Sequence, residues 1–286
     1  MPTITDNLRT WASHDWGQHG DEWSAPWGGA RMQWAGTIFP RIQAFVPVDN
    51  ILEIAPGHGR FTQFLLEHCR YLVGVDLAEA CVEACRTRFT HHTDARFFVN
   101  DGHSLPMVAD TAVDFAFSFD SLVHADTEAM HGYVHELSRI LRQDGVAFLH
   151  HSNLGAYSEQ LDLSAPQHNP HWRDTTFSAD RMLEYCREAG LLCVAQELVE
   201  WGDVNGRLSD CLSVLTRPGS RFARDLCRRE NRRFNEEAPR LASLAELFAI
   251  GRAARPSINQ VVPSRPRWAW IKQHLRGGLP ARHHQP

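Results

Sequence analysis

Short apolar runs alternate with helical patterns through the middle of the chain. Seven segments have the length and composition of strands: 50–55, 71–76, 95–100, 112–119, 145–151, 191–201 and 210–217. Between them, apolar residues at helical spacing predict helices over 59–69, 78–89, 127–142 and 178–190. Strands that alternate with helices of this length need crossover connections, so we expect a mostly parallel sheet with helices on both faces.

The ends of the chain differ from this alternation. A short polar turn separates the last two strands, so we expect them to pair antiparallel, with the final strand reversed. The charged run over 220–250 predicts a long helix, and residues 251–286 show little periodicity. The first residues carry tryptophans among Gly, Asp and His, which favours a cap over the main domain; an aromatic anchor at the edge of the core is the alternative. We therefore expect three parts: a cap over 1–48, a main domain over 49–218 with an insertion at 152–176, and a C-terminal helix and tail over 219–286.

Composition narrows the class of protein. The chain has 286 residues, is 43% hydrophobic and carries a formal charge of −5. It is too apolar for a disordered chain, and it lacks the excess of basic residues typical of nucleic-acid binding. No apolar run reaches the roughly 20 residues of a membrane helix, and the N-terminus has no signal pattern. Seven scattered cysteines favour a reducing, cytoplasmic location.

The most specific motif is LEIAPGHGRFTQFL over 52–65, where a strand meets a glycine-rich turn and a helix. Glycine lets the backbone approach a ligand closely, and the new helix offers free N–H groups. Glu53, near the end of the strand, would repel a pyrophosphate, so the turn favours a cationic ligand with an ammonium or sulfonium group.

This run resembles motif I of class I S-adenosylmethionine (SAM)-dependent methyltransferases. Asp76 at the end of the second strand, Asp101 after the third, and the segments over 112–124 and 133–153 resemble the family's later motifs in the same order. The resemblance implies a Rossmann-like α/β fold with a seven-stranded sheet, SAM as cofactor and S-adenosylhomocysteine as product. Ala55 departs from the family's first glycine, yet it is small enough to keep the turn.

The resemblance also assigns cofactor contacts. Asp76 would accept the ribose hydroxyls, and Asp101 would take the adenine amino group. An N-cap or a turn is the alternative role for each of these aspartates. The residues expected to bind SAM are Glu53, Ala55, Gly57, Gly59, Asp76, Leu77, Asp101, Gly102, His103 and Phe119.

Histidines supply the candidate bases. Methyl transfer to a hydroxyl requires loss of a proton, and histidine is a natural base near neutral pH. His124 follows the fourth strand, while His150 and His151 end the fifth, where alternation sends their side chains to opposite faces. We expect His151 as the base, with His124 as second candidate and Asp120 orienting a histidine or binding substrate. A structural role is the alternative for each histidine.

Aromatic residues predict a pocket for a small acceptor such as a sugar, a glycan end or a flat natural product. The substrate-pocket residues we expect are Trp16, Trp27, Asp120, His150 and Trp172. Metal-independent chemistry is expected, because no dense acidic cluster or zinc motif is visible. The alternative is a divalent ion held by Asp120 or Asp126 together with histidines at 124, 150, 151, 168 and 171.

Three functions remain open at this point. The first is an O-methyltransferase in biosynthesis, with a histidine base. The second is a C- or N-methyltransferase acting on an isoprenoid or an amine, because an aromatic cage can stabilise a cation. The third is a protein that binds SAM or a partner without catalysis. A stripe of Leu241, Leu244, Leu247 and Phe248 would pack on the domain or across a homodimer.

Overall fold

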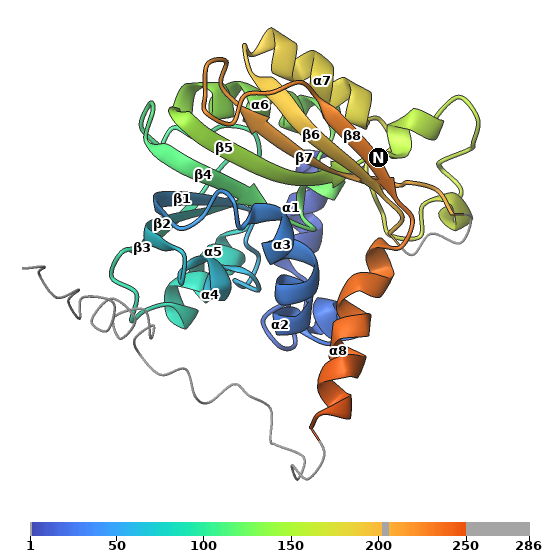
Figure 1. The fold of residues 1–286 in the computed structure, drawn as a ribbon, viewed down its shortest axis with the longest axis horizontal. Coiled ribbons are helices and arrows are strands. Elements are labelled where there is room, and N and C mark those ends of the chain that lie inside the picture. The colour runs from blue at the N-terminus through green and yellow to red at the C-terminus, as the bar shows by residue number, and fades with distance from the viewer. Residues whose placement is uncertain (1, 202–205, 250–286) are drawn as a thin grey trace, which may run out of the picture. The chain divides into compact units, whose positions relative to one another are not determined.

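The computed structural model describes residues 2–201 and 206–249. The tail expected over 251–286 therefore lies outside the described residues, as does part of the turn before the final expected strand. The described residues up to Ala245 pack as one compact unit, which contains the whole sheet (Figure 1).

The sheet is mostly parallel, as the alternation predicts. Its order is β3-β2-β1-β4-β5-β7-β6-β8, and β7 runs antiparallel to both of its neighbours. The predicted reversed strand is thereby confirmed, but the sheet has eight strands within residues 2–201 and 206–249 rather than the seven expected. Their bounds are Val48–Ile54 (β1), Cys69–Asp76 (β2), Ala95–Val99 (β3), Val113–Ser118 (β4), Leu141–Ser152 (β5), Leu192–Val199 (β6), Asp210–Thr216 (β7) and Cys227–Asn231 (β8).

The eighth strand occupies part of the segment that we expected to be helical. It pairs parallel with β6 at the edge of the sheet, where Arg228 donates to Gln196 Oε1 at 2.9 Å. Charged, exposed side chains are common on edge strands, so the apolar alternation that identifies a strand is missing here. The helix itself begins only at Glu237, and its Leu241 and Leu244 remain exposed. A homodimer across that stripe stays a prediction.

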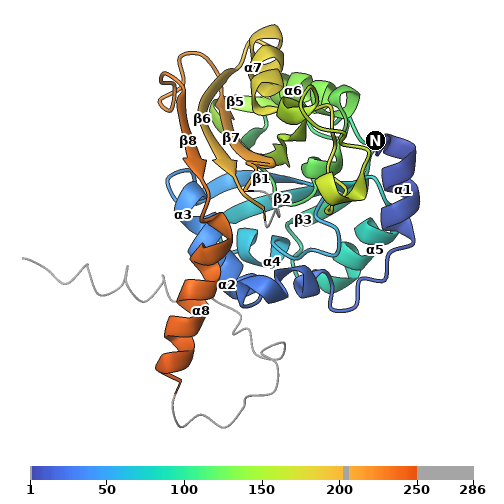
Figure 2. The ribbon, with the colours of Figure 1, turned by 90° about the vertical axis from the view of Figure 1, so that its right-hand side faces the viewer.

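Helices cover both faces of the sheet. Figures 1 and 2 show α6 and α7 on one face and α2 to α5 on the other. None of the described helices is long and apolar enough to cross a membrane. The helices are α1 (Ile4–Ala12), η1 (Asp21–Trp27), α2 (Ala30–Gln33), the π-helical η2 (Trp34–Ile38), α3 (Phe39–Ile42), α4 (Thr62–Leu65), α5 (Glu79–Arg88), η3 (Leu122–His124), α6 (Thr127–Ile140), η4 (Leu154–Tyr157), η5 (Pro166–His168), α7 (Ala179–Glu188), η6 (Phe234–Glu236) and α8 (Glu237–Leu247).

Two hydrophobic cores lie between the sheet and its helices, one on each face, because successive side chains of a strand point to opposite faces. Ile51 of β1 packs into a core rich in aromatic residues beneath α2 to α5. Its neighbour Leu52 packs into a mostly aliphatic core beneath α6 and α7, with Met130 and Leu137. The central strands of the sheet are thus buried on both faces, and a ligand site is expected where these strands end.

Candidate functional site

The chain turns sharply between the end of β1 and α4. The Ala55 N–H donates to the Val75 carbonyl at 2.7 Å, which ties the start of the turn to β2. Ala55 has a φ of +56° and Gly57 a φ of +58°, so both adopt the left-handed region. A Cβ at Gly57 would lie 2.7 Å from the Trp16 ring. Glycine is therefore required at 57, whereas Ala55 is strained.

The strain at Ala55 predicts that Ala55→Gly stabilises the protein. The left-handed conformation costs an alanine roughly 1–2 kcal/mol, and glycine avoids that cost. The greater flexibility of glycine in the unfolded chain lowers stability by only about 0.5–1 kcal/mol. We expect the free energy of unfolding in urea to rise by up to about 1 kcal/mol. The matched change Ala116→Gly, in the buried β4, should lower it by about 1 kcal/mol. Equal losses in both variants would show that Ala55 is unstrained.

Two buried carboxylates stand beside this turn. Asp76, at the end of β2, accepts the Gly57 N–H at 3.0 Å and the Ala78 N–H at 2.9 Å. Burial nevertheless raises the pKa of Asp76 to about 6, against those two hydrogen bonds. Glu53 accepts the Thr62 hydroxyl at 2.5 Å, and burial together with the nearby charge of Asp76 raises its pKa to about 7. A cation bound here would favour the ionised form of both groups.

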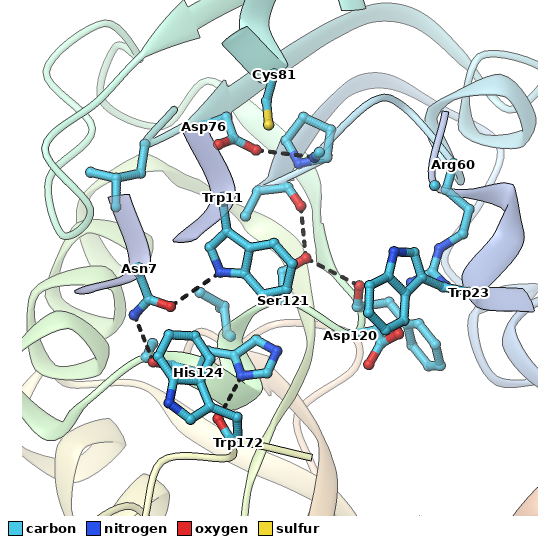
Figure 3. A pocket seen from close by; sticks show the side chains of 18 of the residues that line it. Asn7, Trp11, Trp23, Arg60, Asp76, Cys81, Asp120, Ser121, His124 and Trp172 are labelled. Atoms are coloured by element: carbon cyan, nitrogen blue, oxygen red, sulfur yellow. Dashed lines mark hydrogen bonds and ion pairs between the residues drawn. The ribbon is translucent and has the colours of Figure 1, made fainter. Parts of the chain in front are cut away.

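A cavity of about 740 Å³ opens at this edge of the sheet. We call it the chamber (Figure 3). Its wall joins the ends of β1, β2 and β4 to α1, η1, η3 and the loop before α7. Six tryptophans line it, at positions 11, 16, 23, 27, 172 and 201. The chamber is thus largely apolar and rich in tryptophan, with a few polar groups at fixed places.

Most of the predicted site residues line the chamber. Seven of the residues expected to bind SAM do so: Glu53, Ala55, Gly57, Asp76, Leu77, Gly102 and Phe119. Five of the residues expected in catalysis or in the substrate pocket also do so: Trp16, Trp27, Asp120, His124 and Trp172.

Three of the expected cofactor residues lie outside the chamber lining. Asp101 uses its carboxylate within its own turn, where it accepts the N–H of His103 at 3.0 Å and that of Ser104 at 2.7 Å. His103 is half exposed beside Asp101. Gly59 faces the ring of Phe89 behind the turn. The turn-forming role that the sequence left open for Asp101 is the one its contacts favour.

Neither histidine of β5 lines the chamber. His151 is fully buried on the other face, with Nδ1 2.8 Å from the Ser152 carbonyl and Nε2 2.8 Å from the Ser213 hydroxyl. His150 lies beneath Asp120 and accepts its N–H at Nδ1, so Nε2 carries the proton that Asp210 accepts at 3.0 Å. Side chains of β7 bind both rings, since Asp210 binds His150 and Ser213 binds His151. The expectations that His151 faces the acceptor and that His150 lines its pocket are therefore wrong.

A buried ion-pair network forms the floor of the chamber. Asp120, with a φ of +61°, pairs with Arg60 at 2.9 Å and lies 3.6 Å from Arg173. Arg173 also pairs with Asp210 at 3.0 Å. Burial opposes ionisation of Asp120, but the two guanidinium groups outweigh it and lower its pKa. No sequence pattern marks Arg60 or Arg173 as buried residues of this site.

His124 is fixed at the chamber wall by its surroundings. Its Nδ1 lies 2.8 Å from the Trp172 carbonyl, so Nδ1 carries the proton. Its own carbonyl accepts the Asn7 amide at 2.8 Å, and Asn7 also accepts the Trp11 indole N–H (Figure 3). Burial, and then the charge of Arg173, lowers the pKa of His124 to about 4. The ring is therefore neutral at pH 7, with a lone pair on Nε2.

The metal alternative has no support at the chamber. Potential metal ligands are the side chains of His, Cys, Asp and Glu that lie within ligand distance of one another. His131, His135 and Glu188 form the one group of three found among the described residues. None of these lines the chamber. The group that the sequence suggested around Asp120 or Asp126 does not assemble in the described part of the chain.

A family profile described as a methyltransferase domain matches residues 51–145. No curated protein matches the sequence.

Solved structures share the fold. The PH0226 protein of Pyrococcus horikoshii is 18% identical, with a TM-score of 0.52 over 66% of this chain and 91% of that chain. A SAM-dependent methyltransferase of Methanosarcina mazei is 16% identical, with a TM-score of 0.50 over 63% and 98%. A chain from the complex of the Haloferax volcanii Trm112 methyltransferase activator with a methyltransferase is 19% identical, with a TM-score of 0.52 over 75% and 97%. At these identities the likeness shows the fold alone.

Proposed function

We propose that the chain, as a class I SAM-dependent methyltransferase, methylates a hydroxyl group of a small molecule held in the chamber, with His124 as the base. The observation that carries the proposal is the position of His124. Its Nδ1 is held by the Trp172 carbonyl, and no hydrogen-bond partner for Nε2 is found among the described residues. Nε2 is therefore the atom that can receive a proton from the acceptor.

The residues beside the glycine turn fit SAM. When bound, SAM supplies a methyl group activated by a positively charged sulfur. Asp76 presents a carboxylate for the ribose hydroxyls, and Gly57 leaves the space that a side chain would fill. Glu53 adds negative charge on the same wall. These groups suit a cationic nucleoside better than a pyrophosphate, which the two carboxylates would repel.

The tryptophans of the chamber would bind and orient the acceptor. Trp11 lies 5.3 Å from His124 between ring centroids, and Trp172 lies 5.4 Å away, so aromatic faces stand next to the base. A flat or ring-shaped acceptor would stack there and leave a hydroxyl at Nε2. Asp120 stays ionised beside two arginines and would accept a second hydroxyl of the acceptor. We therefore propose a hydroxylated ring compound as the acceptor class.

The test is a screen for methylated products. Purified protein is incubated with SAM and a panel of phenols, sugars and hydroxylated natural products, and mass spectrometry follows both the gain of one methyl group and the formation of S-adenosylhomocysteine. Fragmentation then locates the methyl group. A methyl on oxygen supports the proposal, whereas a methyl on nitrogen or carbon would overturn it.

A second candidate is methylation of an amine or a carbon centre. Its support is the six tryptophans that line the chamber, because aromatic faces stabilise a cationic product or intermediate. The lowered pKa of His124 also makes this histidine a weak base. An amine acceptor does not need a strong base. The same screen with amines and isoprenoids decides between the two candidates.

The raised pKa values of Asp76 and Glu53 predict pH-dependent SAM binding. A group whose pKa is raised by burial is protonated below that pKa, so at pH 5 both carboxyls are largely neutral. Raising the pH to 8 ionises them, and SAM affinity should increase by about tenfold or more. Calorimetry in buffers of different ionisation enthalpy would measure the affinity and the protons released. Asp76→Asn should flatten the profile; an unchanged profile would show that Asp76 does not titrate on binding.

A further inference from the structure

Two histidines and a glutamate meet on the outer surface, across two helices. His131 and His135 lie one turn apart on α6, and Glu188 is the last residue of α7. The two Nε2 atoms lie 3.1 Å apart, and Glu188 Oε2 lies 3.4 Å from Nε2 of His131. All three side chains are exposed. Three potential ligand atoms therefore face one point outside the chamber.

We propose that His131, His135 and Glu188 bind a divalent transition-metal ion of the zinc type. Zinc is held by nitrogen and oxygen ligands at about 2.0–2.2 Å, which places neighbouring ligands of a tetrahedron roughly 3.3–3.5 Å apart. The two separations given above, 3.1 and 3.4 Å, are close to that edge length. The fourth position faces solvent and would hold water. Two imidazoles exclude Mg²⁺ and Ca²⁺ as preferred ions, since these favour oxygen ligands.

The surroundings of the three ligands favour a cation. Glu188 ends α7, where the partial negative charge of the helix terminus attracts positive charge. The ring of Tyr185 meets His131 edge to face, with centroids 4.9 Å apart, and so limits the rotation of that imidazole. The metal would cross-link α6 to α7, which lie side by side in both ribbon views (Figures 1 and 2). It would bind the folded chain in preference to the unfolded one, so it should raise the melting temperature.

The experiment measures zinc binding to the whole protein after removal of any affinity tag and treatment with a chelator. Calorimetry with zinc chloride should give one tight site per chain, and the melting temperature should rise by several degrees in excess zinc. His131→Ala combined with His135→Ala should weaken binding at least 30-fold and abolish the thermal shift. Glu188→Gln should weaken binding less.

The matched control is His91→Ala, because His91 is an exposed histidine outside the group of three. This variant should bind zinc as tightly as the unmodified chain. Cobalt provides a second readout, since a tetrahedral Co²⁺ site absorbs visible light and the double variant should lose that absorption. Zinc binding that is equally tight in the double variant, or that is absent from the unmodified chain, would overturn the proposal.

Discussion

Replacing His124 by glutamine should lower kcat by about 10²–10⁴-fold for a hydroxyl acceptor, with SAM affinity unchanged. Glutamine can still donate to the Trp172 carbonyl, so the loop should keep its position. The glutamine side chain has no basic nitrogen to replace Nε2, so no group at this position can accept the proton of the acceptor hydroxyl. Steady-state kinetics at saturating SAM measure kcat, and calorimetry measures SAM affinity.

His91→Gln is the control for this experiment, since His91 is exposed and does not line the chamber. The pH dependence gives an independent readout. A base acts only when it is unprotonated, so kcat at saturating SAM should stay level from pH 8 to pH 5 and fall as the pH approaches about 4. A kcat that stays within about threefold of the original in His124→Gln would remove His124 from the chemistry and favour an amine or carbon acceptor.

The residues around the glycine turn could be brought together from the sequence because their signals are local, and their binding of SAM stays a prediction. Glu53 and Gly57 lie within one strand and turn, and Asp76 ends the next strand. In a parallel sheet these ends meet at one edge, so reading successive strand ends was enough to bring the residues together. Asp101 shows the limit of that rule, since its carboxylate is engaged by the N–H groups of its own turn.

The acceptor side could not be predicted in the same way. Strand alternation alone allowed one of His150 and His151 to face the chamber. Both side chains are instead held by β7, whose residues pair with β5 from about 60 positions later in the sequence. Arg60 and Arg173 are both buried beside Asp120, which pairs with them. A charged residue that is buried in an ion pair leaves no periodic pattern in the sequence. Ion pairs between distant segments are visible only once the chain is folded.

Asp210→Ala should be among the most destabilising single changes in the protein, with a loss of about 3–5 kcal/mol in the free energy of unfolding. Asp210 is fully buried and accepts hydrogen bonds from Arg173 at 3.0 Å and from His150 at 3.0 Å. Alanine would leave the Arg173 guanidinium with the more distant Asp120 carboxylate as its anionic partner among the described residues, and the His150 N–H without its acceptor. Urea denaturation of the two proteins gives the difference.

The matched control is Asp110→Ala. In the original protein the Asp110 carboxylate pairs with Arg139 at 2.7 Å on an exposed surface. Its loss should cost no more than about 1 kcal/mol, because solvent screens that pair and hydrates what remains. If both variants lost the same small amount, the network under the chamber would be no more important for stability than a surface ion pair.

The pH dependence of stability separates the charge of Asp210 from its shape. Burial opposes its ionisation, but Arg173 and His150 outweigh burial and lower its pKa below the ordinary value. A lowered pKa contributes stability that is present above the unfolded value of about 3.9 and is lost as the pH falls further. Asp210→Asn keeps the size of the side chain and an acceptor for His150, yet it carries no titrating charge. The stability difference between the original protein and Asp210→Asn should therefore be largest above pH 5 and shrink toward pH 3, and a constant difference would show that shape rather than charge holds Arg173 beneath the acceptor.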